Sequence, residues 1–138
     1  MRMNAREHVP RLRRAAAALI LACVALALAA CDPPEDRYTT AQAPSGGNPS
    51  HGASLIRQYG CGECHIVPGI AGAEGLVGPP LNKLARRVYI AGVMRNSPDN
   101  LMAWLQDPQA VVPGNAMPRM GLNRDQARDI TAYLYTLR

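Results

Sequence analysis

Three stretches of the chain place apolar residues at the spacing of an amphipathic helix, over residues 51–60, 99–106 and 124–137. The middle stretch follows Ser97, a residue type that caps helix N-termini, and stops before Pro108. The pattern therefore predicts three helices separated by irregular segments.

The last stretch has the clearest periodicity. Asn123 precedes it as an N-cap, and its apolar residues recur every three or four positions. These residues are Ala127, Ile130, Leu134 and Leu137. In the first stretch Leu55, Ile56 and Tyr59 lie near one face. Each helix is therefore expected to bury one side.

The segment between the first two helices is rich in Gly and Pro. Residues 66–96 are expected to form loops, with one short helix over residues 81–87. The sequence contains no internal repeat and no strand pattern of the kind that a βαβ unit needs. We therefore predict a small, loop-rich, all-α fold.

The first 30 residues have the pattern of an export signal. Five arginines lie within residues 2–14, and residues 15–30 carry no charge. This apolar run is shorter than the ~20 residues that a membrane-spanning helix needs. We expect a cleaved signal peptide over residues 1–30, with an uncleaved anchor helix as the alternative.

The apolar run ends in Leu28-Ala29-Ala30-Cys31, which resembles the lipobox of bacterial lipoproteins. The resemblance implies acylation of Cys31 as a lipid anchor, while Cys23 leaves with the signal peptide. Residues 31–50, rich in Pro, Gly and Ser, are expected to form a flexible tether. Asp32 resembles an inner-membrane retention signal. We expect the protein at the outer, periplasmic face of the bacterial inner membrane.

Removal of the predicted signal peptide changes the charge of the chain. The formal net charge is +5, from 15 basic and 10 acidic residues, and the first 30 residues hold five Arg and one Glu, so about +1 remains. Nucleic-acid binders need clustered Lys and Arg on their folded part, so this class is excluded. With four Tyr, one Trp and no Phe, the domain over residues 51–138 has little bulk for a core. A large apolar cofactor is expected to fill it.

Cys61 and Cys64 are the cysteines that remain, in the sequence CGECH. Such a pair can form a disulfide, a redox-active dithiol, half a zinc site or a heme attachment site. His65 favours heme, because positions i, i+3 and i+4 share one helix face, so two thiols can bond the heme while the imidazole meets the iron. Zinc would need two more ligands, and His51 is the only other histidine after the leader. A redox thiol protein without heme remains an alternative.

Four separated segments resemble the class I cytochrome c family. Gly52 matches the N-terminal helix and residues 130–134 the C-terminal helix that crosses it. Residues 78–81 match the family's Gly-Pro-x-Leu loop, and residues 101–117 match the helix and loop that deliver an axial methionine. The last segment also resembles the cytochrome domain of bacterial heme-copper oxidase subunit II. The resemblance implies crossing N- and C-terminal helices, with loops wrapped around one covalent heme c.

The resemblance assigns the heme-binding residues. Cys61 and Cys64 hold heme c covalently, His65 is one axial ligand, and Met117 is the other. The Pro79 carbonyl is expected to accept the Nδ1 hydrogen of the ligating histidine, which leaves Nε2 for iron.

Other side chains compete with Met117 for the sixth iron position. Met120 lies in the same segment and is its main rival. Met102 is expected in a helix core, Met94 matches no ligand position, and His51 precedes the helix on the other side of the heme.

Three further residues have roles implied by the resemblance. Arg87 is expected near a heme propionate, or else in solvent. Trp104 is expected beside the axial sulfur, a place that core packing would also give it. Asn115 is expected to bond a propionate, or else to be a turn residue. Tyr89 is assigned either to the heme edge or to the surface.

These assignments predict an electron carrier and not an enzyme, since filled axial positions leave no site for a small-molecule substrate. The expected donor is a quinol-oxidising complex and the expected acceptor a terminal heme-copper oxidase. Lys83 is the only lysine, so membrane tethering is expected to replace charge steering. The alternatives are a general tethered carrier, and a ligand-binding or peroxidase-like heme protein with a weak Met117 bond.

Overall fold

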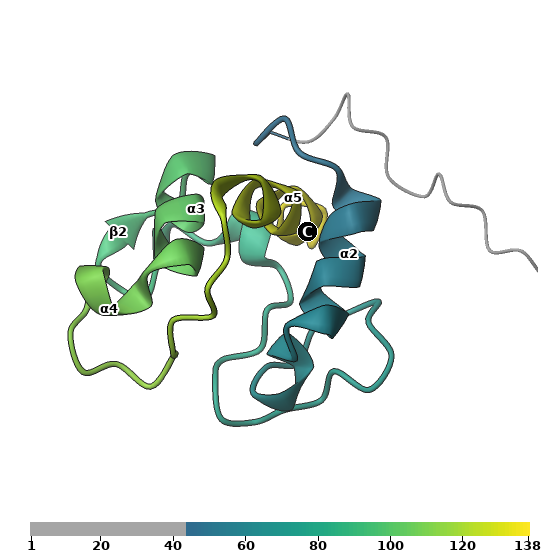
Figure 1. Cartoon of the computed structure of the whole chain (residues 1–138), viewed down its shortest axis with the longest axis horizontal. Coiled ribbons are helices and arrows are strands. Elements are labelled where there is room, and N and C mark those ends of the chain that lie inside the picture. Colours follow the sequence, from purple (N-terminus) through teal and green to yellow (C-terminus); the bar gives the residue numbers. More distant parts are fainter. Residues whose placement is uncertain (1–43) are drawn as a thin grey trace, which may run out of the picture. The chain divides into compact units, whose positions relative to one another are not determined.

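The computed structural model describes residues 44–138, so the predicted signal peptide, Cys31 and most of the tether lie outside the described residues. In this part of the chain most regular structure is helical (Figure 1). The α-helices are α2 (Pro49–Gln58), α3 (Pro98–Gln106), α4 (Pro108–Val111) and α5 (Arg124–Leu134). The 3-10 helices are η2 (Cys61–Glu63) and η3 (Leu84–Arg86), and the strands are β1 (Tyr89–Ile90) and β2 (Met94–Arg95). None of the helices within residues 44–138 is long and apolar enough to cross a bilayer.

The first described helix, α2, begins before the predicted domain boundary at residue 51. Asn48 caps it, because its side-chain oxygen accepts hydrogen bonds from the N–H groups of Ser50 (3.0 Å) and His51 (3.2 Å). Pro49 occupies the first turn, where a missing N–H costs nothing. The buried residues of α2 are Pro49, Gly52, Leu55 and Ile56.

The last helix, α5, has the predicted cap and the predicted apolar face. Asn123 and Gln126 form a capping box, in which each side chain accepts the other's backbone N–H. The helix ends at Leu134 rather than at residue 137. The chain then tightens into a turn, in which the Leu137 N–H donates to the Leu134 carbonyl (3.2 Å).

Helices α2 and α5 cross in close contact, as the family resemblance implied (Figure 1). A Cβ at Gly52 would lie 2.0 Å from the Asp129 carbonyl oxygen and 3.1 Å from the Ile130 Cα. A side chain therefore has no room at this position, and the crossing requires glycine.

Three hydrogen bonds join the start of α2 and the residues just before it to α5. Asp129 is 8% exposed, accepts the Asn48 N–H through Oδ1 (2.8 Å) and pairs with His51 Nδ1 through Oδ2 (2.7 Å). The Ser45 hydroxyl donates to the Arg128 carbonyl (3.0 Å). Ser45 and Asn48, which were predicted to belong to the tether, are therefore bonded to the folded domain.

The segment between η2 and α3 is mostly loop, with η3 inside the range predicted as a short helix. Strands β1 and β2 form an antiparallel hairpin. Ala91 and Gly92 have φ values of 50° and 75° at its turn, the left-handed conformation that tight hairpins use. The domain is mainly helical, but the prediction of an all-α fold missed this hairpin. The hairpin was not predicted, because strands of two residues show no alternation.

Helix α3 begins at its predicted cap and α4 follows after one residue. The Ser97 hydroxyl accepts the Asn100 N–H (3.2 Å), and the Asp107 carboxylate accepts the Ala110 N–H (3.1 Å) at the start of α4. Pro108 interrupts the helix as predicted, and it also starts the next one. Helix α3 packs against α5.

Candidate cofactor site

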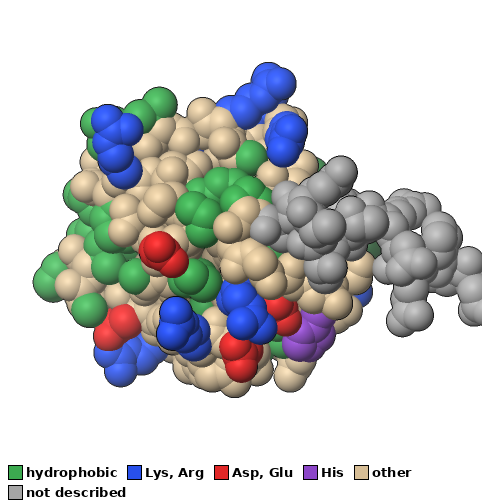
Figure 2. Space-filling model, turned by 90° about the horizontal axis from the view of Figure 1, so that it is seen from above, with side chains coloured by type: hydrophobic (Ala, Val, Ile, Leu, Met, Phe, Trp, Pro, Cys, Tyr) green, Lys and Arg blue, Asp and Glu red, His purple; other side chains and the backbone are tan. Residues whose placement is uncertain are grey.

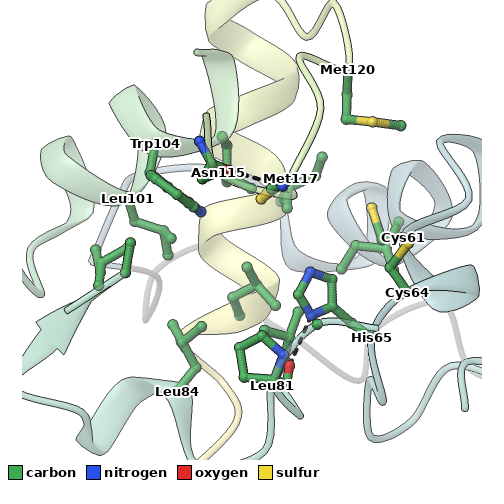
Figure 3. Close-up of a pocket in the computed structure, with 18 of the residues that line it drawn as sticks. Cys61, Cys64, His65, Leu81, Leu84, Leu101, Trp104, Asn115, Met117 and Met120 are labelled. Carbon is green, nitrogen blue, oxygen red and sulfur yellow. Dashed lines mark hydrogen bonds between the residues drawn. The ribbon is translucent and has the colours of Figure 1, made fainter. Parts of the chain in front are cut away.

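A cavity of about 370 Å³ lies between α5, α3 and the loops around them (Figure 3). Its lining is mainly apolar, and no carboxylate is among the described residues that line it. All the heme-binding residues predicted from the sequence line this one cavity. They are Cys61, Cys64, His65, Pro79, Arg87, Trp104, Asn115 and Met117. The fold therefore brings together segments that are far apart in the sequence.

Cys61 begins η2, which is a single turn rather than part of an α-helix, and Cys64 caps its C-terminal end. Gly60 starts the turn in the left-handed conformation, at φ 65°. The Cys61 carbonyl accepts the N–H groups of Cys64 (3.3 Å) and His65 (3.0 Å). Cys61 and Cys64 are free thiols, and both are half-buried. One tight turn thus presents all three side chains to the cavity.

Burial raises the pKa of the Cys61 thiol, because the thiolate would lose hydration. A backbone hydrogen bond lowers the pKa in part, and the neighbouring Cys64 raises it. The thiol is therefore protonated at neutral pH.

His65 is held by the loop that carries the Gly-Pro-x-Leu match. Its Nδ1 lies 2.8 Å from the Pro79 carbonyl oxygen. A carbonyl only accepts, so Nδ1 carries the hydrogen and donates it. Nε2 is left with its lone pair, on a ring that lines the cavity. The sequence-based prediction of this hydrogen bond agrees with the geometry.

Met117 reaches the cavity from the loop between α4 and α5. In Figure 3 its side chain lies beside that of Trp104 from α3, on a different side of the cavity from His65. Met120 also lines the cavity and is drawn nearer to the two cysteines (Figure 3). Met94 and Met102 are absent from the lining, in agreement with their exclusion as ligands.

The polar residues predicted near the propionates bond to backbone in the structure. Asn115 donates through its amide to the carbonyls of Pro108 (2.9 Å) and Val112 (2.6 Å). The half-buried Arg87 donates to the carbonyls of Pro80 and Asn82. Both side chains line the cavity and shape its loops.

Two residues that the sequence did not single out hold the site's loops. Asn96 donates to the carbonyls of Leu84 (2.8 Å) and Arg87 (2.9 Å). Gln109 bonds three residues of the loop that carries Met117. Isolated amides in polar segments give no sequence signal, because their partners are backbone groups that only the folded loop supplies.

The donor groups and walls of the cavity fit heme c. The imidazole of His65, the thioether of Met117 and the thiols of Cys61 and Cys64 surround an apolar space. Heme would offer its iron to the imidazole and the thioether, and its vinyl groups to the two thiols. Within residues 44–138 no group of three or more His, Cys, Asp or Glu is arranged to hold a metal ion directly. A zinc site therefore has no ligand set in the described chain.

The comparisons with known proteins point in the same direction. A model of the family described as Cytochrome c matches residues 50–138. Three curated relatives are named cytochrome c oxidase subunit 2. The protein of Alkalihalophilus pseudofirmus is 32% identical over 90 residues, 64% of this chain and 25% of the relative. That of Bacillus subtilis is 37% identical over 68 residues, 48% of this chain and 19% of the relative. That of Bacillus sp. strain PS3 is 34% identical over 82 residues, 56% of this chain and 23% of the relative.

The chain thus spans a quarter or less of the length of these relatives. The family match, by contrast, covers most of the chain, including the CGECH motif, the loop that holds His65 and the segment of Met117. Membership implies covalently bound heme c. The chain belongs to the cytochrome c family, as a class I c-type cytochrome similar in this region to cytochrome c oxidase subunit 2.

Proposed function

We propose that the protein is a membrane-tethered, monoheme electron carrier, with His65 and Met117 as axial ligands and Cys61 and Cys64 as attachment sites. Heme c, when bound, supplies an iron that changes by one electron between its ferric and ferrous states. One observation carries the proposal: an imidazole with a free Nε2 and a thioether line the same apolar cavity from separate segments.

The surrounding residues prepare these groups for binding. The Pro79 carbonyl keeps the proton on Nδ1 of His65 and fixes the plane of its ring. The soft thioether of Met117 favours the ferrous state and so raises the reduction potential relative to a second histidine. Apolar side chains, including Trp104, line the cavity around these groups. With two protein ligands, no position is left for a substrate, which suits a relay.

Optical spectra of the heme-loaded protein test the ligand assignment. We expect a sulfur-to-iron charge-transfer band in the oxidised protein, abolished in Met117→Ala and retained in Met120→Ala. The reduced wild type should not bind carbon monoxide, whereas reduced Met117→Ala should. A missing band, or ready binding of carbon monoxide by the wild type, would favour the ligand-binding or peroxidase-like alternative.

The proposed tether starts at an acylated Cys31 and places the domain at the periplasmic face of the inner membrane. Its support is the leader pattern over residues 1–30 and the lipobox-like sequence. Membrane and soluble fractions of the expressing bacterium test it. Cys31→Ser should move the protein out of the membrane fraction, whereas Cys23→Ser should leave it there. Equal distribution of both variants would refute the anchor.

The proposed partners are a quinol-oxidising donor and a terminal heme-copper oxidase as acceptor. The names of the curated relatives support an oxidase partner. Charge gives little steering, since Figure 2 shows Lys and Arg at separate positions on the face drawn, some beside Asp or Glu. Co-purification of an oxidase after mild detergent extraction is expected. A domain that instead reduces several acceptors equally well would be a general carrier.

A further inference from the structure

The loop that carries Met117 has little backbone structure of its own. Within residues 113–122 the backbone–backbone hydrogen bonds of the described chain are limited to that from the Asn115 N–H to the Val112 carbonyl (3.2 Å). Gly114 has a φ of 78°, which turns the chain sharply. Other contacts must therefore hold Met117 in place.

Side-chain amides bind both backbone polar groups of Met117. The Met117 N–H donates to Oδ1 of Asn115 (2.8 Å), and the Met117 carbonyl accepts from Nε2 of Gln109 (2.9 Å). The placement of the Met117 backbone thus depends on two side chains and not on a helix or strand.

Gln109 makes the larger share of these bonds. Its Nε2 also donates to the Asn115 carbonyl (3.0 Å), and its Oε1 accepts the Gly114 N–H (3.0 Å). One half-buried amide therefore bonds three residues of the loop. Gln109 itself lies on α4, whose first turn is capped by Asp107. The Asp107 carboxylate also pairs with Arg119, which follows Met117 in the sequence.

We propose that Gln109 is a positioning residue for Met117, which holds the loop so that the thioether stays in the cavity and exogenous ligands are kept from the iron. The inference rests on the proposed function, in which Met117 is an axial ligand. Two of the three bonds run to carbonyl oxygens, so the residue must donate twice. Glutamine meets this requirement and glutamate does not.

Two variants distinguish the effect of the Gln109 N–H donors from that of the rest of its side chain. Gln109→Glu keeps the length and one acceptor but sets a carboxylate against two carbonyl oxygens. Gln109→Leu removes all three bonds. Gln106→Leu is the matched control, because Gln106 lies on α3, outside the cavity lining, and makes none of these bonds.

The readout is the affinity of the oxidised, heme-loaded protein for imidazole, measured by optical titration. We expect imidazole to bind both Gln109 variants about tenfold more tightly than the wild type, because each variant loses at least two of the hydrogen bonds that hold the loop of the competing thioether. Gln106→Leu should match the wild type. In a Met117→Ala background, Gln109→Leu should change the affinity little, since no thioether remains to be positioned.

Two outcomes overturn the proposal while Met117 remains the ligand. One is wild-type imidazole affinity in Gln109→Glu. The other is an equal effect of Gln109→Leu with and without Met117, which would indicate general loosening of the cavity. A Met117→Ala protein that binds imidazole no more tightly than the wild type overturns both this inference and the proposed function. If Gln109→Leu does not fold, Gln109→Glu decides alone.

Discussion

His65 is held by two neighbours that act on different parts of its ring. The Pro79 carbonyl accepts its Nδ1 hydrogen, while the Gly78 backbone lies against the ring itself. A Cβ at Gly78 would lie 2.2 Å from Cε1 and 2.6 Å from Nδ1. The Gly78 N–H donates to the Cys64 carbonyl (2.7 Å), which keeps this loop on the CGECH turn. The missing side chain at residue 78 thus allows the loop to reach the imidazole.

Gly78→Ala is expected to displace the imidazole and to lower the free energy of unfolding of the heme-loaded protein by about 2–3 kcal/mol. Gly72→Ala is the control, because its Cβ meets open space and only its left-handed backbone is strained, at about 1–2 kcal/mol. Denaturant unfolding and optical spectra measure both effects. An unchanged heme spectrum in Gly78→Ala would contradict the role of this contact.

Tyr135 gives the domain a pH-dependent stability. Its hydroxyl donates to Oδ1 of Asn96 (2.8 Å), and burial raises the pKa of the phenol above its ordinary value of 10.0. The folded state therefore holds the phenol proton more tightly than the unfolded state. This contribution is complete below the unfolded pKa and is lost as pH rises through the folded pKa.

From about pH 9 to about pH 11, the wild type should therefore lose more unfolding free energy than Tyr135→Phe. Denaturant titrations at several pH values measure the difference. Parallel curves for the wild type and Tyr135→Phe would refute the assignment.

Local motifs predicted the residues that face the cavity better than they predicted its polar contacts. Cys61, Cys64 and His65 form one short motif, so a single turn suffices to place them. Asn115, expected at a propionate or else in a turn, bonds the backbone of Pro108, Val112 and Met117. Gln109 gave no signal, because its partners come together only when the loop closes.

At the scale of elements, caps and apolar spacing predicted three helices correctly. Ser97 and Asn123 start α3 and α5, as their hydrogen bonds show. Helix α4 was missed because it is one turn long and begins at a proline that was expected only to end a helix. The start of α2 depends on Asn48, which lies in a segment whose composition suggested a tether.

Gly52→Ala tests the crossing of α2 and α5. Its Cβ would press on the Asp129 backbone, so we expect a loss of about 3 kcal/mol or more in unfolding free energy, although alanine favours helices. Gln58→Ala, at an exposed position of α2, should stay within about 0.5 kcal/mol of the wild type. Equal stability of the two variants would show that the helices can separate without cost.

At the scale of the whole domain, the core is built around the cavity. Ile130 and Leu134 of α5 and Leu101 of α3 are buried and also line it. Without a ligand, these walls would lack partners on one side, and a domain of this size has little other apolar surface to bury. Heme is therefore expected to act as part of the core.

Cys61→Ala/Cys64→Ala protein produced without heme should accordingly be largely unfolded, because the cavity then has nothing to close around. Far-ultraviolet circular dichroism measures its helix content, with the heme-loaded wild type as the reference. A helical spectrum and a cooperative thermal transition in the heme-free variant would show that the polypeptide alone supplies a sufficient core.

The sequence by itself determined the helices with strong caps and periodic apolar faces, and the CGECH turn. Each of these depends on neighbours within a few residues, so local spacing carries the information. Only the tertiary structure decided three features: the hydrogen bond from the Asn48 N–H to Asp129, the β1–β2 hairpin, and the bonds from Gln109 to the loop that carries Met117. These features join backbone and side-chain groups from separate turns, and only chain folding brings such groups within hydrogen-bonding distance.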